Sequence, residues 1–577
     1  QQKSVYVGLI QNPMHHAYTL VPRLLDTRRV TVSKDKLTLK QAMVGEDQET
    51  WRMVCEGELM QLTRRCVFEL VPHPKGRKLV GSRWVLTIKR KPDGSVDKYK
   101  GRLVAQGFTQ VEGQDYDATY AEVAPIELLL CFLAVAVQGD WSIQQIDIES
   151  AFLYADLDQE IYMKQPEGFR DGTDRVWRLH KALYGLNQSP RQWSIKLSEN
   201  LSKLGFKPME NKPSMYQRTL DGIMVTLIVY VDDILIGSKN KEETFKVKED
   251  ISKIFDIADF GEPGPFLSLN IQRNKGELLL DSRKNVRELL KSMKSDLETI
   301  KFRSMVPMTI EDAKVATRIE EAEANIDLAT RFQQKPIQLS KQDQQWAEKL
   351  NVEQHKKYRS CVGMLNYLVT RTRPDVGYAT SILSRHTNSP RRIHWRMVLR
   401  LVCWLDRYPD CPIVFRKVKE PKLVCYSDAS ACAEYAVKAH RGYMWSFGGC
   451  YFAWKSKKIN RLVFNVHEAE IFGVVAALSI ARIYKDIFVQ LGVLKPKSSI
   501  TLYTDSYSTV KSFEREDELP KKSRNMNLPI GMIRAAMEEL NVQLCHIPGK
   551  DNPADQLTKP LRVEDVVSQA KLVVRIE

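Results

Sequence analysis

The adjacent aspartates Asp232 and Asp233 constrain the fold of this chain more than any other feature. They stand between two apolar runs in "VTLIVYVDDILIGSK", residues 225–239. Apolar runs of this length are typical of buried strands, and adjacent like charges resist burial. The stretch therefore predicts a hairpin of two buried strands with both carboxylates at its tip. Either water solvates that tip or something positive lies on it.

A third carboxylate can reach the same point. Asp147 ends an alternating strand in "WSIQQIDIESAFLY", residues 141–154. Three converging carboxylates repel one another strongly unless divalent cations neutralise them, and Mg²⁺ prefers oxygen ligands together with substrate phosphates. Two such ions stabilise the attacking and leaving oxygens of a phosphoryl transfer. For an Asp-Asp turn taken by itself, simple solvation is the better interpretation.

A second acidic set lies near the end of the chain. It consists of Asp428 in "CYSDAS", Glu470 in "HEAEIFGVVAAL", Asp505 in "LYTDSYSTV" and Asp555 in "GKDNPADQLTKPL". The pattern predicts two aspartates at strand ends, a glutamate on a helix and an aspartate that opens the last helix. Four carboxylates again need cations, and two Mg²⁺ ions would activate a water against a phosphodiester. Each carboxylate alone is better explained as a surface residue.

The length and composition of the chain indicate the number of its domains and the class of its partners. A chain of 577 residues is too long for one core, so several domains are expected. The formal net charge of +16 favours a polyanion such as nucleic acid, although a merely basic surface is the alternative. The ten cysteines form no CxxC pair, which argues against a zinc site or a disulfide framework and suits a reducing compartment.

The longest apolar run, "LLLCFLAVAV" at 128–137, predicts a buried helix. Ten residues are too few to span a bilayer, so no membrane partner is expected. No signal peptide opens the chain. Its first residues, "QQKSVYVGLI", contain no initiating Met and look like a cut end, as of a polyprotein.

Local patterns outline the rest of the chain. Helical spacing marks residues 38–62, and two strands around a Pro-Asp-Gly turn are predicted within 79–110. Residues 274–350 are the most charged part and are predicted to be helix and linker with little core. Strands and helices alternate again from residue 420 onward.

Longer motifs around the acidic residues resemble one known family. The segments "QIDIESAFLYADLDQEIYMKQPEGF", "HKALYGLNQSPRQW" and "YVDD" resemble the reverse transcriptase of copia-type (Pseudoviridae) LTR retrotransposons. The resemblance continues at 98–125 and 358–390 and covers the chain from about residue 38 to residue 562. Chance does not produce such long segments in the right order.

The resemblance implies an α+β fold: a right-hand polymerase with fingers, palm, thumb and connection, followed by a ribonuclease H-like mixed α/β domain. It divides the chain into an N-terminal extension leading into the fingers, the fingers and palm, the thumb with a charged linker, the connection and the ribonuclease H domain. These segments are expected at 1–78, 79–260, 261–350, 351–419 and 420–577, respectively.

The resemblance also assigns roles near the first acidic set. Asp147, Asp232 and Asp233 match the metal-binding aspartates of the polymerase palm. Phe152 matches the aromatic that presses on the sugar of the incoming nucleotide and leaves no room for a 2′-hydroxyl, the group that distinguishes RNA from DNA. Its alternative is an ordinary core position. The basic finger hairpin carries two candidate phosphate ligands, Lys100 and Arg102.

Which of these two cations contacts the nucleotide is left open, and a solvated basic face is the alternative for both. "SPRQW" at 189–193 is expected beneath the template strand, and "FLSLNI" at 266–271 is similar to the hairpin that holds the primer end.

In the last domain the four acidic residues match the metal-binding carboxylates of ribonuclease H. Glu470 takes the position of the catalytic glutamate, whereas Glu468, two residues away, lies on another side of the helix. The sequence departs from the family's motifs at "NVHEAE" and at "KKSRNMNLPI", but neither departure removes a metal ligand. His467 and His546 are interpreted as packing or surface residues.

The resemblance implies an RNA- and DNA-directed DNA polymerase that also degrades the RNA of RNA–DNA hybrids. It implies two Mg²⁺ per active site, with Mn²⁺ as an alternative. The expected partners are an RNA template, a primer, the hybrid and deoxynucleoside triphosphates, with integrase and capsid proteins of the same polyprotein as further candidates. The expected location is cytoplasmic, within virus-like particles, with the nucleus as a second location.

Two other functions are weighed against this one. A domesticated scaffold would bind nucleic acid without chemistry, and lost metal ligands would mark it. An RNA-dependent RNA polymerase usually has Gly-Asp-Asp where this chain has Tyr230-Val231-Asp232-Asp233, and it needs no ribonuclease H domain.

Overall fold

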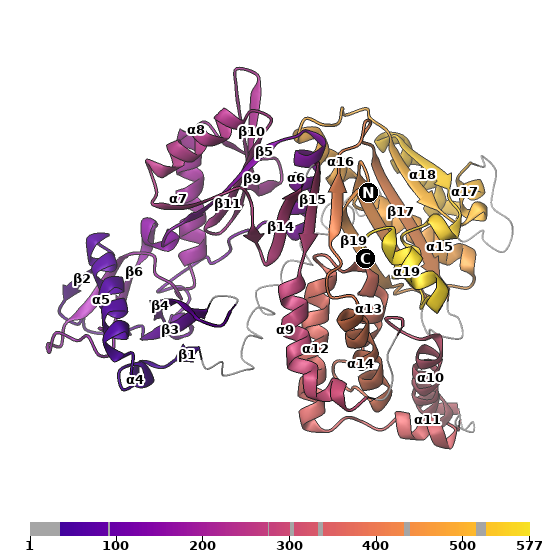
Figure 1. Cartoon of the computed structure of the whole chain (residues 1–577), viewed down its shortest axis with the longest axis horizontal. Coiled ribbons are helices and arrows are strands. Elements are labelled where there is room, and N and C mark those ends of the chain that lie inside the picture. Colours follow the sequence, from indigo (N-terminus) through magenta and orange to yellow (C-terminus); the bar gives the residue numbers. More distant parts are fainter. Residues whose placement is uncertain are drawn as a thin grey trace. The chain divides into compact units, whose positions relative to one another are not determined.

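The computed structural model describes residues 35–90, 93–274, 276–300, 305–332, 338–431, 439–514 and 527–576. Residues 1–34 of the predicted N-terminal extension, which was expected at 1–78, therefore lie outside the described residues. The described chain divides into two compact units (Figure 1). The first unit comprises residues 35–124 and 142–262, and the second comprises residues 125–141 and 263–576.

A six-stranded antiparallel sheet forms the centre of the first unit, with strand order β12-β5-β11-β10-β9-β8. Its strands are Ile257–Gly261, Ser142–Ile148, Asp233–Ser238, Ile223–Tyr230, Lys212–Leu220 and Lys207–Met209. Two helices, α7 (Ser189–Lys203) and α8 (Lys241–Ser252), pack their apolar sides against the sheet in one core. The predicted hairpin around Asp232 and Asp233 is confirmed as β10–β11.

Two smaller sheets complete the first unit. The hairpin predicted within 79–110 is confirmed as β3 (Ser82–Arg90) and β4 (Val96–Ala105), although Pro92 of its turn lies outside the described residues. Helix is also confirmed within 38–62, and α5 packs on β4. The remaining elements are β1 (Lys36–Leu37), α4 (Leu39–Ala42), α5 (Gln48–Arg64), η2 (Gly107–Thr109), η3 (Ala151–Tyr154), and the sheet of β2 (Phe68–Val71), β7 (Val176–Lys181) and β6 (Asp156–Met163).

The second unit contains a mixed five-stranded sheet with strand order β19-β18-β17-β20-β21. Its strands are Cys450–Lys458, His440–Phe447, Leu423–Ser430, Ile500–Thr504 and Val542–His546. The first three are antiparallel, whereas β20 runs parallel to both β17 and β21. This is a ribonuclease H-like arrangement, as expected. The helices around it are α15 (Val466–Leu478), α16 (Ala481–Gln490), α17 (Tyr507–Glu514), α18 (Asn527–Leu540) and α19 (Val563–Lys571), with the short 3₁₀ helices η6 (Gly549–Asp551) and η7 (Asp555–Leu557).

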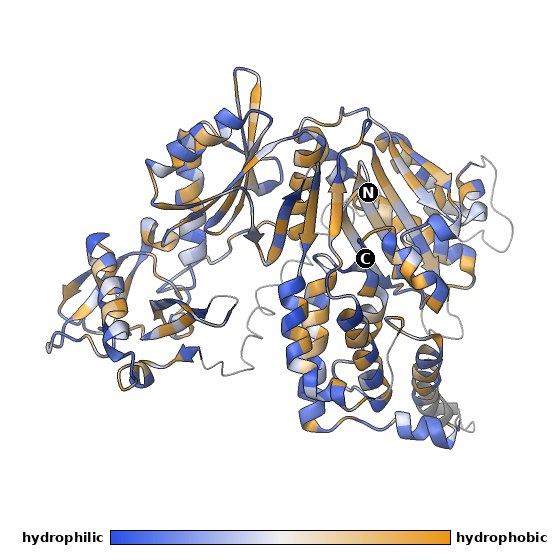
Figure 2. Ribbon diagram, viewed as in Figure 1, coloured by the Kyte–Doolittle hydropathy of each residue, from blue (hydrophilic) through white to orange (hydrophobic). Residues whose placement is uncertain are grey.

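The apolar run at 128–137 is confirmed as a buried helix, α6 (Ile126–Gln138), which is coloured hydrophobic along most of its length in Figure 2. It packs against β19 and β16 (Ile413–Arg416) of the second unit, and Gln138 Nε2 donates to the carbonyl of Arg416 at 2.7 Å. Among the described helices, none is both long and apolar enough to cross a membrane. Helix α6 belongs to the second unit, whereas the strands before and after it in sequence belong to the first. The five segments expected from the sequence stay a prediction.

A second sheet and a group of helices complete this unit. The sheet order is β13-β14-β15-β16, with β13 (Pro265–Phe266), β14 (Leu269–Asn274) and β15 (Glu277–Asp281). The helices are α9 (Arg283–Glu298), α10 (Ile310–Phe332), α11 (Lys341–Trp346), α12 (Val352–Val369), η4 (Pro374–Val376), α13 (Gly377–Ser384) and α14 (Arg392–Arg407).

The expectation of little core within 274–350 is wrong. Leu289 and Met293 of α9 and Ala316 and Ile319 of α10 are buried in one cluster with α12 and α14. The charged residues of α9 are mostly exposed, which leaves its apolar face for the core. In α10, Asp312 is buried and pairs with Arg396 and Arg400 of α14.

A buried ion pair ties the helices of this cluster together. Arg373, which lies in the family-like segment 358–390, donates to both carboxylate oxygens of Asp375 at 2.9 and 2.8 Å. Trp404 Nε1 of α14 also donates to Asp375, and Arg373 donates to the carbonyl of Tyr408. Arg373 is 2% and Asp375 6% exposed, so neither charge has water as a substitute partner.

We expect Asp375→Asn to lower the free energy of unfolding of the second unit by about 3–5 kcal/mol, because it leaves the Arg373 charge buried and unpaired. Thermal unfolding measures the loss. Glu298→Gln is the control, since its exposed pair with Lys294, at 4.0 Å, contributes at most about 0.5 kcal/mol. Equal, small effects of both substitutions would contradict this account.

Candidate metal centres

A strained two-residue turn presents the first pair of acids. Tyr230 pairs with Asp233, so only Val231 and Asp232 form the turn between β10 and β11. Val231 has a φ of 58°, a left-handed conformation that a β-branched residue rarely adopts. Trp193 of α7 holds this turn by donating from Nε1 to the Val231 carbonyl at 2.7 Å. Trp193 belongs to "SPRQW", for which the sequence predicted a place beneath the template and not this support of the turn.

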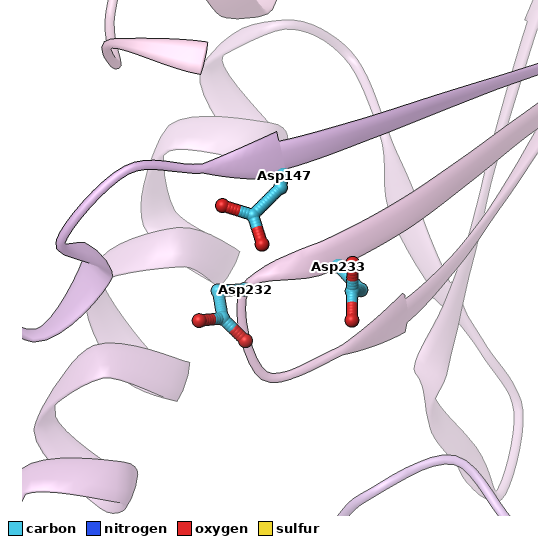
Figure 3. A group of neighbouring side chains, drawn as sticks. All are labelled: Asp147, Asp232 and Asp233. Atoms are coloured by element: carbon cyan, nitrogen blue, oxygen red, sulfur yellow. The ribbon is translucent and has the colours of Figure 1, made fainter. Parts of the chain in front are cut away.

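Strand pairing brings the third acid to the same place. Asp147, near the end of β5, lies directly opposite Asp233 of β11. Ligand oxygens of Asp147, Asp232 and Asp233 all lie within 4.8 Å of one another (Figure 3), and these three residues are called the first acidic cluster. Burial, followed by the charge of Asp232, raises the pKa of Asp147. Burial and both neighbouring charges raise the pKa of Asp233 to about 7.

The basic hairpin β3–β4 supplies positive charge to this cluster. The charges of Lys100 and Arg102 oppose the rise in the pKa of Asp147. Burial and the charge of Arg102 lower the pKa of Lys100. The guanidinium of Arg102 lies 4.3 Å from the centre of the Tyr184 ring. Both predicted phosphate ligands therefore lie close enough for their charges to act on Asp147, and the geometry does not choose between them.

An aromatic pair lies next to these cations. Phe152 on η3 meets Tyr184 edge to face, with ring centres 4.9 Å apart, and packs against the core of the six-stranded sheet. Burial raises the pKa of Tyr184 to about 12. The sequence analysis missed Tyr184, although it stands inside the quoted motif "ALYGL"; only the fold shows that it joins Phe152 to Arg102.

The second acidic cluster forms where two parallel strands end. Asp428 lies two residues before the end of β17 and Asp505 follows β20, and their preceding residues, Ser427 and Thr504, are paired. Ligand oxygens of Asp428, Asp505 and Asp555 lie within 4.8 Å of one another. The expectation that Asp555 opens the last helix is wrong. Asp555 starts the short 3₁₀ helix η7, and the chain turns again before α19.

Glu470 and Glu468 have different surroundings on α15. Burial, and then the charges of Asp428 and Asp505, raise the pKa of Glu470. Glu468 instead accepts from the backbone N–H of Phe464 at 3.0 Å, at the start of the helix. The structure thus places Glu470 toward the second acidic cluster and Glu468 in the local N-terminal turn.

The second acidic cluster contains unsatisfied oxygens and one cation. Burial and the Asp428 charge raise the pKa of Asp505 and of Asp555. Among the described residues, one oxygen each of Glu470 and Asp505 is buried without a hydrogen-bond donor. Lys559 Nζ lies 2.5 Å from Asp555, a contact that the sequence analysis missed. Buried oxygens that lack donors fit hard divalent cations.

The sequence analysis also made predictions for the segment "FLSLNI" and for two histidines, which lie outside the acidic clusters. Part of "FLSLNI" forms the predicted hairpin β13–β14, and Tyr367 Oη of α12 donates to the Leu267 carbonyl in its turn at 3.4 Å. His467 lies 3.1 Å from Ser512 Oγ of α17. His546 meets Tyr507 edge to face.

Comparison with known proteins supports the family expected from the motifs. Residues 65–308 match the family described as "Reverse transcriptase (RNA-dependent DNA polymerase)". The retrovirus-related Pol polyprotein from transposon TNT 1-94 of Nicotiana tabacum is 28% identical over 552 residues, 93% of this chain and 39% of that protein. The corresponding polyprotein from transposon RE1 of Arabidopsis thaliana is 29% identical over 528 residues, 90% of this chain and 33% of that protein.

Among solved structures, the foamy viral protease-reverse transcriptase in complex with dsDNA aligns with a TM-score of 0.44 and 14% identity, covering 86% of this chain and 83% of that one. This chain spans 39% and 33% of the lengths of the two polyproteins. Residues 65–308 therefore match a reverse transcriptase family, and most of the chain is similar to these retrovirus-related Pol polyproteins of transposons.

Proposed function

We propose that this chain is an RNA- and DNA-directed DNA polymerase that also cleaves the RNA strand of RNA–DNA hybrids. The observation that carries the proposal is the pair of separate acidic clusters, one in each unit, each with three carboxylates within 4.8 Å. Two Mg²⁺ or Mn²⁺ ions per centre would supply the charge that stabilises the attacking and leaving oxygens of phosphoryl transfer.

At the polymerase centre, Asp147, Asp232 and Asp233 would hold the ions. Lys100 and Arg102 would bind the triphosphate of the incoming deoxynucleotide by charge-assisted hydrogen bonds. Phe152 would lie against its sugar and exclude a 2′-hydroxyl. The strained turn at Val231 and its bond from Trp193 keep Asp232 at the tip, so the acids are positioned before substrate binds.

At the ribonuclease centre, Asp428, Glu470, Asp505 and Asp555 would hold the ions. Thr558 Oγ1 donates to Asp428 and leaves the other carboxylate oxygen for a cation. Lys559 Nζ contacts the carboxylate of Asp555. Burial lowers the pKa of Lys559, but the charges of Asp428 and Asp555 outweigh this effect and raise it overall. Its ammonium would stay charged and attract the RNA phosphate.

Basic residues beside this centre support a nucleic-acid partner. Arg441 of β18 lies opposite Ala429, the residue after Asp428, and Lys457 of β19 lies opposite Arg441. Burial and the charges of its neighbours lower the pKa of Lys457. Within the described residues, neither cation forms an ion pair with a carboxylate. Phosphates of a hybrid would relieve this repulsion.

The remaining partners follow from the same proposal. An RNA template, a primer and deoxynucleoside triphosphates would bind the first centre, and integrase and capsid proteins of the same polyprotein are candidate neighbours. The proposed location is the cytoplasm, within virus-like particles, with the nucleus as a second location. A scaffold without chemistry is the alternative, but it would need neither acidic cluster.

We expect Asp232→Asn to lower nucleotide addition by about 10³-fold or more and to leave hybrid cleavage intact, because several kcal/mol of charge stabilisation are lost at one centre only. Asp505→Asn should do the reverse. Primer extension on an RNA template and cleavage of a labelled hybrid, run side by side, measure both. Loss of both activities in either variant would show that the centres are not independent.

Replacing Phe152 tests sugar selection. We expect Phe152→Ala to raise the use of ribonucleotides relative to deoxynucleotides by about 10- to 100-fold, since the space of the ring becomes free for a 2′-hydroxyl. Phe152→Tyr keeps the ring and is the control. The ratio of kcat/KM values for the two nucleotides reports the change, and an unchanged ratio in the Ala variant would assign Phe152 to the core alone.

The raised pKa of Asp233, from 3.8 to about 7, predicts how stability depends on pH without metal. The folded state then binds a proton that the unfolded chain has already released, so stability falls as pH rises from about 4 to about 7. Thermal unfolding in EDTA should show this fall. Adding Mg²⁺ should remove most of it, because bound cations replace the proton.

Asp233→Asn is the control for this measurement, because it removes the titrating group. The variant should lose part of the pH dependence in EDTA and show a smaller gain from Mg²⁺. Equal melting temperatures of the unsubstituted protein across this pH range in EDTA would contradict the proposed repulsion.

A further inference from the structure

A guanidinium outside both acidic clusters contacts a fully buried histidine. Arg385 follows the last residue of α13, and its Nη2 lies 2.6 Å from Nδ1 of His440, the first residue of β18. His440 is 0% exposed. Because a guanidinium can only donate, Nδ1 is the acceptor and the proton of the neutral imidazole lies on Nε2.

The hydrogen bonds continue in one direction from this imidazole. His440 Nε2 donates to Ser456 Oγ of β19 at 2.8 Å, and Ser456 Oγ donates to the carbonyl of Leu557 at 2.7 Å. His440 and Ser456 each accept once and donate once. Arg385, His440, Ser456 and the Leu557 carbonyl are called the relay, and it has a single consistent orientation.

The relay ends on the segment that carries a proposed metal ligand. Leu557 closes η7, which begins at Asp555. The next residue, Thr558, donates from Oγ1 to Asp428 and accepts at its carbonyl from Ser430 Oγ at 2.9 Å. A shift of η7 would therefore move Asp555 and disturb Asp428 together.

The packing around η7 leaves it little freedom. A Cβ added to Gly442 of β18 would lie 2.6 Å from Leu557 Cβ, and one added to Gly377 of α13 would lie 2.9 Å from Leu557 Cδ2. Helix α13 packs on β19 within the same unit (Figure 1). The ring of Tyr378 meets His440 edge to face at 5.0 Å and fixes the imidazole plane.

We infer that Arg385 and His440 are positioning residues of the ribonuclease centre, which act through Ser456 and Leu557 on the Asp555 carboxylate. The inference rests on the proposed hybrid cleavage. Arg385 comes from the helical segment that precedes the five-stranded sheet, so the centre is completed by a residue outside that sheet. Burial and the charges of Arg385 and Arg441 hold the pKa of His440 well below its usual value, which agrees with a neutral ring.

Matched substitutions in the full chain test the relay. Arg385→Met removes the donor and keeps an unbranched stem, whereas Arg385→Lys keeps a donor. Ser456→Ala removes the hydroxyl, and Ser456→Thr keeps it. We expect the Met and Ala variants to lower kcat for hybrid cleavage by about 10- to 100-fold, as is typical when support of a metal ligand is lost, with KM for the hybrid and primer extension unchanged.

The Lys and Thr variants should recover most of the cleavage. Arg359→Met is the control, because Arg359 is an exposed arginine on α12 of the same unit. Unchanged cleavage in Arg385→Met and Ser456→Ala, or an equal loss of cleavage and primer extension, would overturn the inference. Failure of Ser456→Thr to recover activity would also count against it.

Hydrogen exchange provides a readout that does not need activity. In EDTA, Arg385→Met and Ser456→Ala should speed amide exchange in peptides covering residues 549–562, while Arg359→Met leaves them unchanged. Unchanged exchange there in the first two variants would refute the relay. Absence of hybrid cleavage in the unsubstituted protein would instead contradict the proposed function, and the exchange data would still decide on the relay.

Discussion

Mutual repulsion between carboxylates that are buried or half-buried is the constraint on which both centres depend. Strand pairing forces Asp147 against Asp233, and η7 brings Asp555 to Asp428 and Asp505. Burial first, and then this repulsion, raises the pKa of Asp233. Such an arrangement lowers stability unless a cation relieves it, so its presence twice in one chain indicates function and not structural support.

Features that depend on local sequence could be predicted. The apolar runs around Asp232 and Asp233 specify a hairpin whose shortest connection puts the acids at its tip, and the ten-residue run at 128–137 specifies a buried helix. The position of Asp147 near a strand end followed from alternation, whereas those of Asp428 and Asp505 were expected from the ribonuclease H pattern. These predictions succeed because each depends on neighbours within a few residues.

Features that depend on distant contacts could not be predicted from the residues alone. Helix α6 packs on strands almost 300 residues later in the chain, and Arg385 meets His440 across a separation of 55 residues. Lys559 and Tyr184 gain their importance only from side chains brought beside them by the fold. The charge of α9 and α10 concealed a buried face, because composition counts residues without their direction.

Direct location of bound metal is the most decisive measurement. Crystals of the full chain grown with Mn²⁺ and a short hybrid, with data collected at the manganese absorption edge, should give anomalous density between Asp147, Asp232 and Asp233 and again between Asp428, Glu470, Asp505 and Asp555. Density at both positions would establish that each group of acids exists to bind cations. Absence of anomalous density from both positions, with the carboxylates still close together, would contradict the central claim.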